Sequence, residues 1–248
     1  MRLLRIFTIA GICFSLGNLQ AQVTTSSGVV RTTTSFSGPI TGIKGLPYSA
    51  DEVHELTRIL ADGTRIQEET HGKSFRDSEG RTRTESEIVM HVGNGARIQH
   101  ITIFDPIERV LINIDPKSKV AIIIPLPTPR TSAAKADSQK TDSQKMPKPA
   151  DKSVYEHLGT EEIDGFSATG DRITRTIEIG QIGNDKPVVS VFETWTATDL
   201  KAVLRSKTDD PENGQRTMKL VNIQRDEPDP ALFRIPEGYT VNDKRTNN

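Results

Sequence analysis

The sequence predicts a mainly β protein, folded as a single curved antiparallel sheet that forms an open, unclosed β-barrel, with a disordered linker in its middle. Between residues 97 and 126, three β-type runs are separated by the turn-forming pairs Asp105-Pro106 and Asp115-Pro116. After residue 152, five further runs are separated by short turn signals. About ten to twelve strands are expected, and so many strands cannot stay flat in one sheet without curling.

The segment 97–126 is predicted to be a three-stranded meander. An Asp side chain accepts hydrogen bonds from the backbone two residues on, and the following Pro presets φ, so each Asp-Pro pair is a turn. The runs between the turns are rich in β-branched residues, which pack well on a pleated surface. These residues are Ile98, Ile101, Ile103, Val110, Ile112, Ile114, Val120, Ile122 and Ile124.

Residues 1–21 have the form of a secretory signal peptide. A basic start at Arg2 and Arg5 precedes an apolar run from Ile6 to Leu16, and Ala21 marks the expected cleavage point. The run is shorter than the ~20 apolar residues that a membrane span needs, which disfavours a retained anchor. We therefore predict a periplasmic or secreted protein with no transmembrane segment after cleavage.

The composition further narrows the class of protein and the kinds of partner that the chain can have. Cys13 is the only cysteine and would leave with the signal peptide, so the mature chain has no disulfide and depends on a hydrophobic core. Lipidation of Cys13 is disfavoured because the bulky Ile12 precedes it. Without Arg2 and Arg5, 30 basic side chains stand against 33 acidic ones. This balance argues against nucleic acid or an anionic membrane as a partner.

Residues 22–46 are rich in Thr, Ser and Gly and are predicted to be a flexible N-terminal arm, followed by a β domain at 47–241. Two signals compete at 50–60. Residues 49–52 have the form of a helix capping box, whereas Asp62-Gly63 is the strongest short hairpin signal in the chain. We predict a strand, because a hairpin needs a strand on both sides, and a helix is the alternative.

Further turns are predicted at Gly72 and at residues 78–80, and the run after them, 81–87, has polar residues on both faces. Residues 126–152 are rich in Pro, Ser and Lys and contain few bulky apolar side chains, which predicts a disordered linker. A partner-docking role for this linker is the alternative. Residues 242–248 are predicted to be a disordered tail.

Beyond the linker, β-type runs recur up to residue 225. Asp229 and Pro230 then suit the N-cap and first position of one short helical turn. The predicted strands lie at residues 155–163, 166–179, 187–195, 201–207 and 216–225.

Several phrases resemble a group of uncharacterised exported bacterial proteins over roughly residues 47–241. They are Phe75–Arg83, Ile101–Pro106, Ile114–Pro116, Leu158–Gly165 and Asp229–Tyr239. More distantly, their succession is similar to the periplasmic lipoprotein carriers (LolA/LolB-like) and their sigma-factor-regulating relatives. That resemblance implies an open β-barrel, a curved antiparallel sheet around an apolar cavity. It assigns no functional residue to a numbered position.

The sequence contains no local motif for catalysis or metal binding. The five histidines lack metal-ligand spacing, and no cysteine remains to help them. The segment around Ser167 lacks the second glycine of a nucleophile elbow, and the acidic turns at 77–79 and 209–212 lack the register of a calcium loop. We predict no metal, no cofactor and no enzymatic activity; an enzyme with a site assembled without a motif is a third hypothesis.

The predicted function is that of an exported, non-catalytic binding protein of the cell envelope, holding a lipid or other apolar ligand on the concave sheet face. The alternative is an envelope structural or interaction protein with a filled core, which binds a protein partner through its outer face or linker. The residues predicted to line the apolar concave face are Ile101, Ile103, Ile112, Ile122, Ile124 and Val191.

Overall fold

A computed structural model of the chain describes residues 19–21, 34–36, 42–89, 96–127 and 152–246. The chain divides into two units, residues 1–42 and 43–248. The described part of the first unit is a short antiparallel pair, β1 (Leu19–Ala21) and β2 (Thr34–Phe36). Most of the predicted signal peptide and arm lies outside the described residues.

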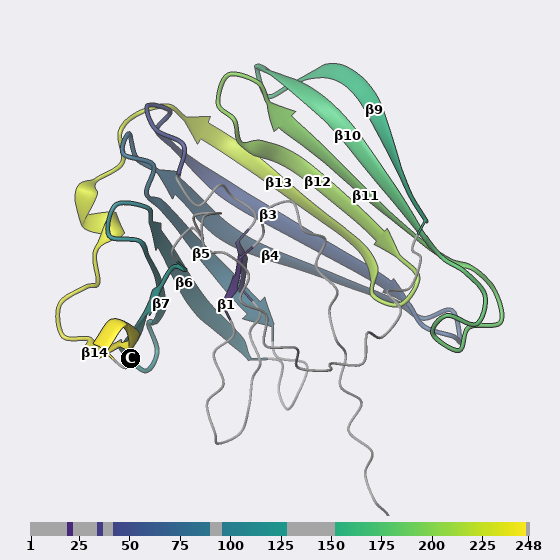
Figure 1. The fold of residues 1–248 in the computed structure, drawn as a ribbon, viewed down its shortest axis with the longest axis horizontal. Coiled ribbons are helices and arrows are strands. Elements are labelled where there is room, and N and C mark those ends of the chain that lie inside the picture. Colours follow the sequence, from purple (N-terminus) through teal and green to yellow (C-terminus); the bar gives the residue numbers. More distant parts are fainter. Residues whose placement is uncertain (1–18, 22–33, 37–41, 90–95, 128–151, 247–248) are drawn as a thin grey trace, which may run out of the picture. The chain divides into compact units, whose positions relative to one another are not determined.

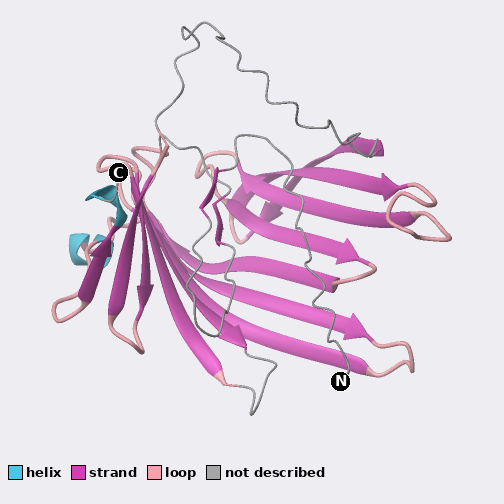
Figure 2. Ribbon diagram, turned by 60° about the horizontal axis from the view of Figure 1, so that its bottom comes forward, coloured by secondary structure: helices cyan, strands magenta, loops and turns pink. Residues whose placement is uncertain are grey.

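The second unit is one sheet of twelve strands in the order β14-β8-β7-β6-β5-β4-β3-β13-β12-β11-β10-β9 (Figure 1). Every neighbouring pair is antiparallel except β14 and β8. Figure 2 shows the strands fanning out and curving, and among the described residues β14 and β9 remain as two separate edges. The predicted mainly β, curved and unclosed sheet is confirmed.

The strands before the predicted linker are β3 (Tyr48–Ile59), β4 (Arg65–Arg76), β5 (Thr82–Val89), β6 (Arg97–Asp105), β7 (Val110–Asp115) and β8 (Val120–Pro125). Those after it are β9 (Lys152–Ile163), β10 (Phe166–Ile177), β11 (Val188–Ala197), β12 (Val203–Asp210), β13 (Gly214–Gln224) and β14 (Thr240–Asp243). A 3-10 turn, η1 (Pro230–Phe233), and a second, η2 (Lys244–Thr246), flank β14. The predicted linker at 126–152 lies outside the described residues, apart from its first two residues and its last.

The predicted meander is confirmed as β6, β7 and β8. Asp105 Oδ1 accepts hydrogen bonds from the backbone N–H groups of Ile107 and Glu108, at 2.8 and 2.9 Å. Asp115 Oδ1 accepts from Lys117 N at 2.9 Å in the same way. Each turn is therefore made by the Asp side chain that the sequence identified, which keeps the three strands in tight succession.

Residues 48–59 form a strand, so the prediction of strand over helix is confirmed. β3 pairs along nearly its whole length with β13 on one side and β4 on the other. The turn to β4 places Gly63 at a φ of 85°, a left-handed conformation that suits glycine, and Asp62 Oδ1 accepts from Thr64 N at 2.9 Å. Pairing on both sides outweighs the local capping-box signal for a helix.

The predicted turn at Gly72 is wrong, because β4 continues through this residue without interruption. A Cβ atom at Gly72 would lie 2.5 Å from the backbone oxygen of Glu85 on β5. Glycine is therefore needed here for a close approach of two strands, and not for a change of chain direction.

The part of the chain after β13, residues 225–246, which we call the C-terminal segment, crosses back to the strands that precede the predicted linker. β13 pairs with β3, whereas β14 pairs with β8 at the far edge, in parallel. Asp229 caps η1, as predicted, by accepting a hydrogen bond from Ala231 N at 2.8 Å. Residues 242–246, assigned from the sequence to a disordered tail, lie in β14 and η2. The parallel ladder with β8 supplies backbone partners to β14 that a sequence pattern does not reveal.

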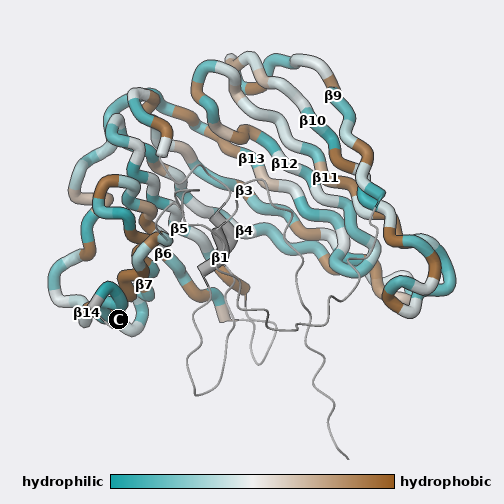
Figure 3. The backbone as a smooth tube through the Cα atoms, viewed as in Figure 1, coloured by the Kyte–Doolittle hydropathy of each residue, from teal (hydrophilic) through white to brown (hydrophobic). Residues whose placement is uncertain are grey.

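The core consists of two separate hydrophobic clusters. Hydrophobic residues gather near β6 and β7 in Figure 3. There the C-terminal segment covers a cluster that we call the meander cluster, Ile103, Val110, Ile112, Ile114, Ala121, Ile123 and Phe233. The second, which we call the hairpin cluster, joins β3 to the strands after the linker through Tyr48, Ala50, Phe166, Ala168, Ala197, Leu200, Ala202, Leu204 and Leu220.

Candidate ligand pocket

A pocket of about 460 Å³ lies on one face of the sheet and is lined by five strands that are consecutive in space, β12, β13, β3, β4 and β5. A pocket shared by so many neighbouring strands requires the sheet to curve around it, so we call this side the concave face. The opposite side is called the outer face. Successive residues of a strand alternate between the two faces.

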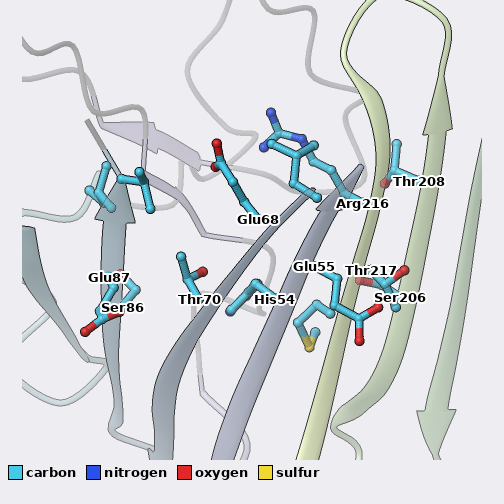
Figure 4. Close-up of a pocket in the computed structure, with 14 residues that line it drawn as sticks. His54, Glu55, Glu68, Thr70, Ser86, Glu87, Ser206, Thr208, Arg216 and Thr217 are labelled. Carbon is cyan, nitrogen blue, oxygen red and sulfur yellow. The ribbon is translucent and has the colours of Figure 1, made fainter. Parts of the chain in front are cut away.

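The floor of the pocket is made of two rows of side chains that run across the strands. In the first row, Thr208, Arg216, Leu56 and Glu68 lie opposite one another in register. In the second, Ser206, Met218, His54 and Thr70 do the same. Figure 4 labels six of these side chains, which project from their strands into the pocket, with Arg216 and Glu68 at the same end: His54, Glu68, Thr70, Ser206, Thr208 and Arg216.

One wall of the pocket arises where β4 and β5 part. The two strands pair only from Gly72 to Arg76 of β4, and beyond Ser86 the rest of β5 pairs with β6 alone. The close approach at Gly72 marks the last pair of this ladder. Residues 87–89 of β5 therefore stand apart from β4, and together with Ser86 they line the pocket from the far side.

Arg97 bridges the gap between these strands. Its Nη1 donates to Glu87 Oε2 at 2.8 Å, and its Nη2 donates to the backbone oxygen of Glu69 at 3.4 Å. One side chain of β6 thus reaches across β5 to β4. It therefore links the two parted strands at the wall of the pocket.

The chemical character of the pocket is mixed. Leu56, Ile88, Val89 and Met218 are apolar, whereas Thr70, Ser86, Ser206 and Thr208 carry hydroxyl groups. Glu52 lies two residues before His54 on β3 and accepts a hydrogen bond from His54 Nε2 at 3.0 Å. The apolar side chains can hold an elongated apolar part of a ligand. The hydroxyl groups and the cation of Arg216 can bind a polar part of the same ligand.

Behind the gap lies a smaller pocket of about 170 Å³, which includes His71, Gly72 and His100. Burial lowers the pKa of His100, against the opposing effects of a hydrogen bond to Asn113 and the charge of Asp115. Its Nε2 atom is buried without a hydrogen-bond partner. Burial therefore favours the neutral form of His100 at the back of the gap.

The six residues predicted to line the concave face do not share one face. Ile101, Ile103 and Ile112 lie on the outer face, where Ile103 and Ile112 form part of the meander cluster beneath Phe233. Their strand partners show the cause: Ile112 lies opposite Ile123, so Ile122 and Ile124 point the other way, to the concave face. A shift of one residue in register reverses the face of every side chain, and register cannot be read from one strand.

Val191 is remote from the other five. It lies on β11, on the outer face, beside the ion pair of Arg172 and Glu193 in a charged recess of about 290 Å³. The large pocket is instead lined by residues that the sequence did not single out for binding, such as Leu56, Thr70, Arg216 and Met218. The polar alternation of residues 81–87 was the only local sign of an exposed sheet face at this place.

No cluster of three or more His, Cys, Asp or Glu side chains that could hold a metal ion occurs among the described residues, and His91 lies outside them. In the same part of the chain, no helix has the length and hydrophobicity that a membrane crossing needs.

Comparison with solved structures finds similar folds at low sequence identity. The chain is similar to an uncharacterised conserved protein from Thermus thermophilus (13% identity, 80% of this chain and 91% of that chain, TM-score 0.45). It is also similar to the lipoprotein LppX from Mycobacterium tuberculosis (14% identity, 74% and 90%, TM-score 0.31). A third structure, assigned to outer membrane lipoprotein sorting in Vibrio parahaemolyticus, has 10% identity over 76% of this chain and 89% of that chain, with a TM-score of 0.29.

No protein-family model matches the chain, and no curated protein matches it either. The function proposed below rests on the residues of the chain itself.

Proposed function

We propose that this chain is an exported, non-catalytic binding protein of the cell envelope, and that the pocket on its concave face holds an amphipathic ligand with an apolar chain, such as a lipid. The observation that supports this most directly is the lining of the pocket. Leu56 and Met218 form apolar parts of its floor between hydroxyl groups and Arg216. A purely hydrocarbon ligand would leave those polar groups without partners.

The predicted signal peptide at 1–21 supports an envelope location. The polar side chains of the pocket also favour binding over catalysis. His54 is paired with Glu52, but the hydroxyl groups of the pocket form no hydrogen bond to this histidine in the described residues. A nucleophile and its base would need to lie within hydrogen-bond reach of each other.

The residues that we expect to contact the ligand therefore differ from those predicted from the sequence. Of the six isoleucine and valine residues, Ile103 and Ile112 are buried beneath the C-terminal segment, with 0% and 8% of their surface exposed. A ligand has no access to them in this state. Thr70, Met218 and Leu56 replace them as the residues that we expect to contact the ligand.

Binding is tested with the purified chain, delipidated and titrated with a fluorescent fatty acid. A Thr70→Trp substitution should weaken uptake about tenfold or more, which corresponds to about 1.4 kcal/mol, because the indole fills the floor of the pocket. Gln67→Trp is the matched control, since Gln67 is exposed on the outer face of the same strand. Equal uptake by both variants would place the ligand elsewhere.

The second candidate is an envelope interaction protein that binds a protein partner. It is favoured by the meander cluster, where the isoleucine-rich face is filled by Phe233 and leaves no space for a ligand. If the wild-type chain takes up no fatty acid, and mass spectrometry of the purified protein finds no bound hydrophobic molecule, this candidate replaces the first.

A further inference from the structure

The two edges of the sheet differ greatly in length. β14 offers four residues at one edge, and the 3-10 turn η2 follows it directly. β9 offers twelve residues at the other. In the described part of the chain, β9 pairs with β10 alone, so its second side carries backbone N–H and C=O groups that no neighbouring strand satisfies. Such an edge is a template for another strand.

Natural edge strands are usually protected by a central lysine, a proline or a bulge. β9 contains no proline, its lysine stands at its first position, and its irregularity lies near Gly159, where the register with β10 shifts. Residues 152–157 are therefore regular, and Lys152, Glu156 and His157 are the ionisable residues among them. Within them, Val154 and Tyr155 are 57% and 61% exposed.

The sequence of this part of β9 is complementary to itself. Two copies of this strand can pair antiparallel around a two-fold axis normal to the sheet. Each residue of one copy then lies opposite a residue of the other copy whose side chain is on the same face. With the axis at Val154, the two Val154 side chains meet, and Ser153 lies opposite Tyr155. Lys152 then lies opposite Glu156 of the second copy, and this ion pair occurs twice. An axis at Tyr155 would place Val154 opposite Glu156 and would form neither ion pair.

We propose that β9 pairs antiparallel with β9 of a second copy of this chain, centred on Val154, to form a homodimer. The proposal is independent of the ligand pocket. Within one chain, Lys152 Nζ contacts Glu178 Oε1 at 2.9 Å and Arg172 Nη1 lies 3.6 Å from Glu156 Oε2. The Lys152 side chain is 76% exposed and that of Glu156 is 48% exposed, so both can exchange or share partners at small cost. One strand pair buries less than the ~1,200 Å² of a stable interface, so the dimer is weak and concentration-dependent.

Sedimentation equilibrium of the full purified chain over a wide concentration range tests the pairing. The wild-type mass should rise towards twice the monomer value. Val154→Lys should leave a monomer at every concentration, because two ammonium groups would meet at the axis. Val189→Lys is the matched control, because Val189 is also a largely exposed valine, 43% exposed, but lies on the interior strand β11. It should behave as the wild type.

A charge exchange tests the register and does not depend on Val154. Lys152→Glu and Glu156→Lys should each abolish the dimer, and the double variant should restore it, with circular dichroism confirming the fold of each. A wild-type monomer at all concentrations overturns the proposal. A dimer that survives Val154→Lys, or that the double charge exchange fails to restore, overturns it equally.

Discussion

Arg76 shows how a single charged residue is accommodated inside this sheet. It is buried, and its Nε donates to the backbone oxygen of Leu46 at 2.8 Å. Its other nitrogens donate to the backbone oxygens of Leu200 and Lys201, and its guanidinium carbon lies 4.8 Å from the ring centre of Tyr48. Burial lowers the pKa of this guanidinium. The three carbonyl groups compensate for its burial, and they tie β4 to the segment before β3 and to the loop before β12.

His100 predicts a pH dependence of stability. In the unfolded chain its pKa is close to the ordinary 6.5, and burial lowers the pKa in the folded protein. The unfolded state therefore binds the proton more readily, so the free energy of unfolding decreases as the pH falls below about 6.5. In His100→Gln this contribution is absent. Urea denaturation from pH 7 to pH 5 should show a smaller loss for the variant than for the wild type, and equal losses would contradict the assignment.

The C-terminal segment acts as a cover for the meander. Phe233 is 4% exposed and packs in the meander cluster, the guanidinium of Arg81 lies 5.3 Å from its ring centre, and Arg83 Nη1 donates to the backbone oxygen of Leu232 at 2.8 Å. An otherwise exposed row of isoleucines is thereby made into a core. Leu232, Ile235 and Tyr239 of the same segment also pack against the cluster, and Phe233 is the residue of this segment that is buried within it.

Phe233→Ala should lower the free energy of unfolding by about 3–5 kcal/mol, because it removes the ring and leaves a cavity over Ile103 and Ile112. Val241→Ala in β14 serves as the control, since Val241 is 49% exposed and its truncation should cost less than about 0.5 kcal/mol. Denaturant titration of both variants measures the difference. A loss below about 1 kcal/mol for Phe233→Ala would show that the cover contributes little.

Within the second unit, the residues after the predicted linker pair with the residues before it at two places. β13 pairs with β3 in the middle of the sheet, and β14 pairs with β8 at the edge. The chain between them carries η1 and Phe233 across the meander. The two parts of the chain are therefore joined by strand ladders and side-chain packing, independently of the covalent connection through residues 128–151.

Limited proteolysis should consequently cut first within residues 128–151, where the sequence predicts a disordered linker, without separating the two parts. The two fragments should elute together in size-exclusion chromatography under native conditions and separate only in denaturant. Fragments that separate without denaturant would show that the β3–β13 and β8–β14 ladders do not hold the sheet together. Cleavage that spares this segment would contradict the linker prediction.

The sequence by itself determined the elements that depend on local chemistry. The Asp-Pro turns of the meander, the Asp62-Gly63 hairpin and the Asp229 cap of η1 each need only a side chain and its nearby backbone, and all three are found. The class of fold followed from them, because many short strands joined by tight turns leave few other arrangements.

Only the tertiary structure decided which side chains share a face and where the pocket lies. Ile112 and Ile122 look alike in the sequence, yet the register of β7 with β8 sends them to opposite faces. Gly72 resembles a turn residue, yet it lies within β4, where the absence of a side chain permits the close approach of β5. The pocket joins Leu56 to Met218 and Arg216 through the β3–β13 ladder, across about 160 residues of chain. Such long-range register is set by the packing of the whole sheet, and a local sequence pattern carries no record of it.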